Sequence, residues 1–210
     1  MDWQNLLMWS KAGVEASSKG ALTSVRSNPV DGSLYTSQGG KYSQAALGGR
    51  LFGISSQVAV AHTAAYAATY TGLAVGNPSG SGVDCSLKIM SFAPSVVSDA
   101  NGTVGIMGGV YGVLPIVSAL AIYNQKLDGP LSKCTATGGQ TINAAPAPTL
   151  LRITGSTGTG AVNTWHGASV ISCDLDGSIV IPPGHFWASY CFMLSTAALQ
   201  FSFVWEEVPI

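Results

Sequence analysis

Residues 174–210, DLDGSIVIPPGHFWASYCFMLSTAALQFSFVWEEVPI, decide the fold class. Aromatic and β-branched residues fill three runs in this stretch, at 178–181, 185–194 and 199–205. Residues that favour turns, namely Asp, Gly, Pro and Ser, separate the runs. This pattern predicts antiparallel strands.

The third run has an aromatic face because successive side chains of a strand point to opposite sides. The residues of that face are Leu199, Phe201, Phe203 and Trp205. Glu206 and Glu207 follow directly, and as neighbours on a strand they cannot form a general acid/base pair. We interpret them as a charged stop that protects an edge strand from unwanted pairing.

Further strands are predicted upstream, so residues 51–210 are expected to form an all-β domain. Short apolar runs alternate with turn-rich stretches such as 76–82 and 155–160, which favours an antiparallel β-sandwich or barrel. Asp174–Gly177 opens like a calcium loop but lacks the later acidic positions, so we predict a hairpin turn there. A division into two small β domains near residues 144–148 stays open.

Residues 104–123, VGIMGGVYGVLPIVSALAIY, are twenty residues without a charge. Their length and GxxxG spacings would suit a transmembrane helix. Four glycines and Pro115 oppose a helix, and two buried strands at about 103–107 and 118–124 explain the stretch equally well. We favour the strands and predict no membrane association.

Residues 1–50 are predicted to form an extended N-terminal arm, since they are rich in Ser, Gly and Ala and have no sustained periodicity. Residues 2–10 have apolar side chains at helical spacing behind Asp2, which predicts a short helix. This helix either packs on its own domain or anchors the arm in a partner. The predicted anchor residues are Trp3, Leu6, Leu7 and Trp9.

The composition points to a protein that works in an assembly. Only 9% of the residues are charged while 47% are hydrophobic, so we expect neighbouring subunits to cover much of the surface. The net charge is −1 and no basic block occurs, which argues against a nucleic-acid partner.

No motif of useful strength for catalysis, cofactor or metal binding occurs, and we predict that the chain is not an enzyme. The three histidines lack the spacing of a local metal site. The cysteines lie far apart, and we interpret them as small buried hydrophobic residues, although two disulfides stay possible. These residues are His62, His166 and His185, and Cys85, Cys134, Cys173 and Cys191.

Three segments resemble structural proteins of tailed bacteriophages: GKYSQAALGGRLFGISSQ at 40–57, GLAVGNPSGSG at 72–82, and residues 177–210. The resemblance implies a jelly-roll or related β-sandwich, a homotrimer and a role in the virion. It covers about two-thirds of the chain.

We therefore expect a capsid decoration or cement protein on the phage head, whose arm contacts the major capsid protein or other virion proteins. The alternative is a tail fibre, spike or receptor-binding module in which Trp165 or Trp187 stacks on host glycans. A hydrolase of cell-wall glycans would need a paired acid and base in a cleft, for which the sequence offers no support.

Overall fold

The computed structural model describes residues 41–56, 60–61, 69–94, 102–110, 120–143, 148–157, 171–192 and 198–210. The chain divides into two units, Met1–Ser43 and Gln44–Ile210. Most of the predicted arm, including the helix expected at 2–10, lies outside the described residues. Residues 44–50 belong to the second unit, where the Arg50 carbonyl accepts a 2.9 Å hydrogen bond from the Glu207 amide.

The described residues form one short helix and eleven strands. Their order is α1 (Ser43–Leu47), β1 (Leu51–Ser55), β2 (Val60–Ala61), β3 (Thr69–Asn77), β4 (Val83–Pro94), β5 (Gly102–Val110), β6 (Tyr123–Asn124), β7 (Thr135–Asn143), β8 (Thr149–Thr157), β9 (Ile171–Ile181), β10 (His185–Phe192) and β11 (Ala198–Pro209).

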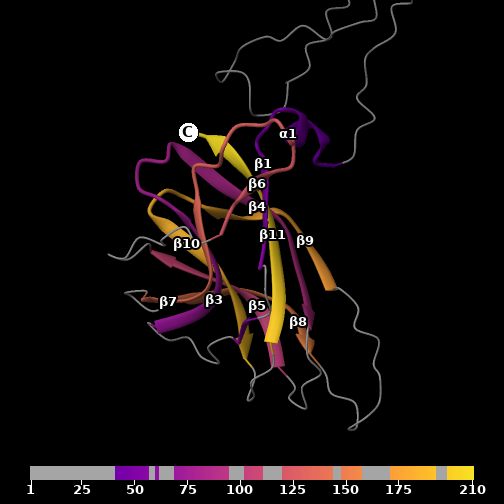
Figure 1. Ribbon diagram of the computed structural model, residues 1–210, viewed down its shortest axis with the longest axis vertical. Helices are drawn as coiled ribbons and strands as arrows, with labels where there is room; N and C mark the ends of the chain where they lie inside the picture. The colour runs from indigo at the N-terminus through magenta and orange to yellow at the C-terminus, as the bar shows by residue number, and fades with distance from the viewer. Residues whose placement is uncertain are drawn as a thin grey trace, which may run out of the picture. The chain divides into compact units, whose positions relative to one another are not determined.

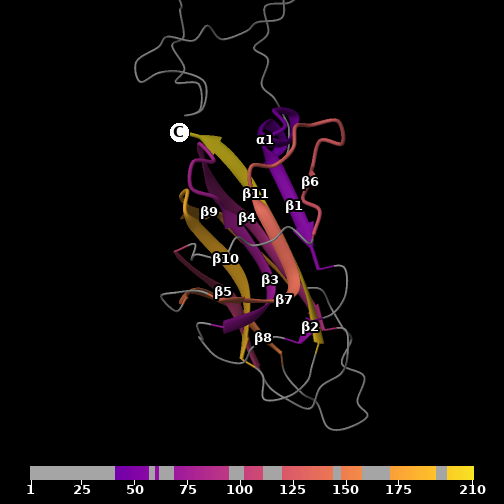
Figure 2. The same cartoon turned by 60° about the vertical axis from the view of Figure 1, so that its left-hand side comes forward.

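The strands build two antiparallel sheets, which confirms the predicted all-β sandwich. The first sheet has the order β6-β1-β11-β4-β9 (Figure 1). Strand β2 also pairs with β11. The second has the order β7-β3-β10-β5-β8 (Figure 2). Strands β7 and β8, on either side of residues 144–148, lie in the same sheet, so the chain does not divide there.

The aromatic face predicted for the third run forms the centre of the core. All four of its members are buried in one hydrophobic cluster with residues of both sheets. Trp187 of β10 packs edge-on against Trp205 at 5.3 Å between ring centroids, and against Phe203 at 6.4 Å. Each buried side chain of this size contributes about 1.5–3 kcal/mol, so these contacts hold the sheets together.

Consecutive strands of residues 174–210 alternate between the sheets instead of pairing with each other. Strands β9 and β11 lie in the first sheet with β4 between them, whereas β10 lies in the second. The turn-forming residues at 182–184 therefore carry the chain from one sheet to the other. As a result, one continuous stretch of sequence supplies aromatic residues to the core from both sheets.

The hairpin predicted at Asp174–Gly177 is wrong, because β9 runs through it from Ile171 to Ile181. Both flanks of the turn pair with β4, and the register shifts opposite residues 87–89. Asp176 (φ 50°) and Gly177 (φ 73°) do adopt the left-handed conformation of a turn. Asp176 and Gly177 therefore form a turn, as their residue types predict. This turn is a bulge within one strand and not the end of a hairpin.

The glycine-rich segment 102–110 is strand β5, which confirms the strand expected at 103–107. Its glycines permit close approach of neighbouring strands: a Cβ at Gly105 would lie 2.3 Å from the Arg152 carbonyl oxygen, and one at Gly108 would lie 2.9 Å from that of Phe186. Within the part of the chain that the structure describes, no helix is long and apolar enough to cross a membrane. Of the second expected strand, residues 123–124 form β6, and residues 118–119 lie outside the described residues.

Candidate functional site

The most exposed large apolar side chains of the described residues lie on one loop, residues 125–134, which we name the β6–β7 loop. Leu127 is 103% and Leu131 88% exposed, while most large apolar residues that the structure describes are in the core. Tyr123, just before the loop, and Leu47 of α1 are exposed as well. Two exposed leucines on one short loop mark a candidate contact surface.

The first half of this loop is held by the side chain of Asn124. Its Nδ2 donates to the carbonyl oxygens of Gly49, at 2.8 Å, and Pro130, at 3.0 Å. Its Oδ1 accepts from the Lys126 amide at 2.9 Å, and the Gly129 amide donates to the Lys126 carbonyl at 2.8 Å. Hydrogen bonds therefore hold the segment that carries Leu127, both within the loop and to Gly49 before β1.

The second half is held by the buried carboxylate of Glu207 in β11. The Lys133 amide lies 3.1 Å from each carboxylate oxygen, and the Ser132 hydroxyl donates to Oε1. The Ser132 oxygen also accepts from the Cys134 amide at 3.0 Å. Hydrogen bonds to a charged acceptor are the stronger kind, and they compensate the burial of this carboxylate.

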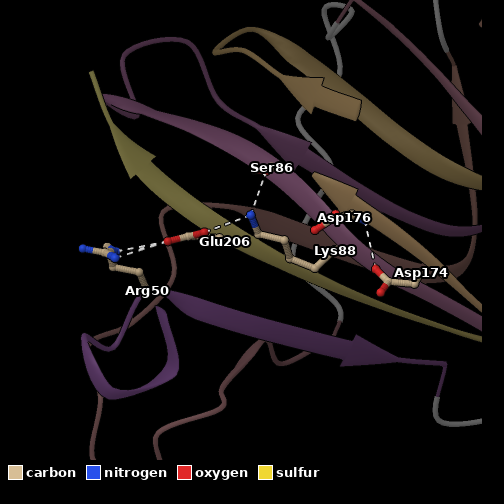
Figure 3. A network of polar contacts seen from close by, with 6 residues as sticks. All are labelled: Arg50, Ser86, Lys88, Asp174, Asp176 and Glu206. Carbon is tan, nitrogen blue, oxygen red and sulfur yellow. Dashed lines mark hydrogen bonds and ion pairs between the residues drawn. The ribbon is translucent and has the colours of Figure 1, made fainter. Parts of the chain in front are cut away.

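Glu206 lies on the other side of β11, in an ion-pair network (Figure 3). One carboxylate oxygen is 3.3 Å from Arg50 Nη2 and the other is 3.0 Å from Lys88 Nζ. Lys88 also donates to the Ser86 hydroxyl at 3.1 Å. The network therefore has a structural role: it joins the start of β1 to β11 and β4.

The interpretation of Glu206 and Glu207 as an edge stop is wrong. Strand β11 is interior, between β1 and β4, and both carboxylates are buried. Arg50 and Lys88 supply the counter-charges that make the burial of Glu206 possible. The two side chains do lie on opposite sides of the sheet, as predicted, so they cannot share a proton-transfer task.

Elsewhere in the described part of the chain, the histidines and acidic residues do not cluster. No group of three or more His, Cys, Asp or Glu residues there could hold a metal ion. The His185 ring nitrogen Nδ1 lies 3.1 Å from the Pro183 carbonyl oxygen. His62 and His166 lie outside the described residues.

The aromatic residues proposed to stack on sugars do not form a site in the described residues. Trp187 is fully buried in the core, so its predicted role in glycan binding is wrong. Trp165 lies outside the described residues, as do the predicted arm anchors Trp3, Leu6, Leu7 and Trp9.

Sequence reasoning missed the exposed leucines of the β6–β7 loop. Its signal is the stretch KLDGPLSK at 126–133, in which two leucines flank an Asp-Gly-Pro turn between charged residues. Leucines beside turn residues face solvent when the turn projects from the sheet, because a short loop has no second layer to bury them.

Comparison with known proteins found no match: no family model, no curated protein and no solved structure is significantly similar to this chain.

Proposed function

We propose that this chain is a structural protein of a phage particle, and most specifically a decoration or cement protein of the capsid. The observation that carries the proposal is the β6–β7 loop, which presents two fully exposed leucines on a backbone held by buried polar groups. A loop that is already ordered loses little conformational entropy when it docks. Such a loop is suited to protein–protein contact.

The strand order supports the same proposal. Without β2, β6 and β7, the sheets are β1-β11-β4-β9 and β3-β10-β5-β8. We interpret this order as a jelly roll of eight strands, an architecture common in viral capsid proteins and lectins. The segments that resemble phage proteins include α1 and β1 (in 40–57), most of β3 (in 72–82), and the end of β9 with β10 and β11 (in 177–210).

Attachment would stabilise a capsid by adding buried apolar area between subunits. Complete burial of the Leu127 and Leu131 side chains would contribute about 3–6 kcal/mol before the costs of association. Because binding energy is shared through linkage, the cement protein and the capsid would stabilise each other. The low charge of the chain favours such contacts, and self-association as a trimer would multiply them.

The deciding experiment is to locate the chain in purified particles and count its copies by electron cryomicroscopy. Copies spread over the head at capsomer junctions are the expected result. A few copies at one vertex or at the tail tip would overturn the decoration proposal.

The proposed arm needs its own test because it lies outside the described residues. Deletion of residues 1–10, which removes Trp3, Leu6, Leu7 and Trp9, should abolish attachment to capsids that lack the chain and leave the sandwich folded. Circular dichroism verifies the fold of the shortened chain. Attachment at full affinity would show that these residues are not the anchor.

The alternative proposal is a host-recognition module of a tail fibre or spike. Jelly rolls also occur in lectins, so the strand order suits this class too. Glycan-array binding by the isolated chain, without binding to capsids, would favour it over the cement proposal.

A further inference from the structure

Two cysteines from distant parts of the chain meet in the core beside the β6–β7 loop. Cys85 lies in β4 of the first sheet, and Cys134 directly precedes β7 of the second. Their sulfur atoms are 3.2 Å apart, although 49 positions separate them in the sequence. Both side chains are buried, and both belong to the main hydrophobic cluster.

The surroundings hold this pair in place from both sides. Cys85 is paired in register with Ile181 of β9 and with Glu207 of β11. The Cys134 amide donates to Ser132, whose hydroxyl in turn donates to Glu207. The sulfurs need to approach by only about 1.2 Å to reach the roughly 2.05 Å of a disulfide bond.

We propose that Cys85 and Cys134 form a disulfide bond that links the two sheets when the protein meets a disulfide-class oxidant. The two sulfur atoms are not bonded to each other in this structure. The bond would close the base of the β6–β7 loop onto β4 and hold the loop that carries Leu127 and Leu131. The inference itself does not depend on the proposed virion role.

The reaction is a double thiol–disulfide exchange. The first cysteine thiolate attacks oxidised glutathione, forms a mixed disulfide and releases one glutathione thiolate. The second cysteine thiolate then attacks the protein sulfur of that mixed disulfide and displaces the second glutathione. Two cysteine thiols and one external disulfide thus become one protein disulfide and two glutathione thiols, which take up the two protons.

The burial of the pair controls how fast this exchange runs. A hydrogen bond with Cys85, burial and the nearby Glu207 carboxylate all raise the pKa of Cys134 above its ordinary value. Since the thiolate is the attacking species, oxidation should be slow at neutral pH and faster as the pH rises. The pair would stay reduced in a reducing cell, and the bond would form and persist in an oxidising environment.

The test is to incubate the full chain with oxidised glutathione at pH 8.5, with a sample in a phosphine reductant as the reference. Thiol titration under denaturing conditions should fall from the four cysteines of the chain to two. Peptide mapping without reduction should recover a fragment that joins residues 85 and 134. Because the bond closes a long loop, the melting temperature should rise by about 10 °C over the reduced form.

Variants separate this bond from other cysteine chemistry. Cys134→Ala should form no disulfide within the chain and show no rise in melting temperature, whereas the matched control Cys173→Ser should still form the bond. If Cys134→Ala fails to fold, the peptide map of the unaltered chain decides. Four thiols retained after prolonged oxidation, or a bond that maps to Cys173 or Cys191, would overturn the proposal. Neither result would bear on particle attachment.

Discussion

Glu206 and Glu207 are neighbours in β11, yet their carboxylates hold different parts of the chain on opposite sides of the first sheet. Glu206 binds Arg50 and Lys88, and so joins the start of β1 to β4. Glu207 accepts hydrogen bonds from the end of the β6–β7 loop. Two adjacent acidic residues thereby make the end of β11 a junction with three segments: the start of β1, β4 and the β6–β7 loop.

Glu206→Gln should destabilise the fold, because it leaves the Arg50 and Lys88 charges without their counter-ion. Removing one partner of a buried ion pair costs roughly 3–5 kcal/mol. The Arg50 side chain is 28% exposed, so we expect about 2–3 kcal/mol here. Urea unfolding followed by tryptophan fluorescence measures the loss.

Asp128→Asn is the matched control for that substitution. It removes a carboxylate from the exposed pair with Lys126, at 3.8 Å. The expected change is within about 0.5 kcal/mol, as for most surface pairs. Equal effects of the two substitutions would contradict a special role for the Glu206 network.

Leu127→Ser combined with Leu131→Ser should weaken attachment to capsids without unfolding the chain. Both side chains are exposed, so the melting temperature should change by no more than about 2 °C. Attachment to capsids that lack the chain should weaken at least tenfold, as measured by co-sedimentation. The control pair Ile153→Ser and Val180→Ser alters exposed apolar residues on other strands and should bind normally. Unweakened binding by the leucine variant would contradict the contact surface.

Gly105→Ala should destabilise the second sheet by about 2–4 kcal/mol, at the upper end of overpacking effects. The added Cβ would meet the Arg152 backbone carbonyl, which cannot move without separating β5 from β8. At Gly109 the nearest atom is Cε1 of the Phe186 ring, at 3.2 Å, which can shift. Gly109→Ala should therefore cost about 1 kcal/mol or less, and thermal unfolding of the two variants compares them. A larger loss at Gly109 would contradict this account of β5.

Alkaline pH should destabilise the protein partly through Cys191. Burial raises the pKa of this thiol from 9.0 to about 12. A raised pKa in the folded state gives stability that is complete below pH 9 and is lost as the pH rises toward 12, because the unfolded chain ionises first. In reductant, the stability of the unaltered chain relative to Cys191→Ala should thus fall by about 2 kcal/mol between pH 7.5 and 10.5. An unchanged difference in urea midpoints across that range would contradict the shift.

Local patterns in the sequence were enough to predict the all-β class and the aromatic face of the core, but not strand β7 or the continuity of β9. The alternation of Leu199, Phe201, Phe203 and Trp205 places them on one face whatever the partner strand, because the two-residue period is a property of the backbone. The turn chemistry of Asp176-Gly177 was equally visible, since few other residues adopt positive φ so readily. The sequence did not indicate that this turn would form a bulge inside a continuous strand.

The sequence by itself thus determined that this protein is built of strands with an aromatic core. Only the tertiary structure decided which sheet each strand joins, that β11 is interior, and that Trp187 is buried instead of free to bind a ligand. It also decided that Cys85 meets Cys134 and that Glu207 holds the β6–β7 loop. These relationships depend on contacts between residues that are far apart in the chain. Strand pairing and side-chain packing select such contacts together, so the local periodicity of the sequence does not predict them.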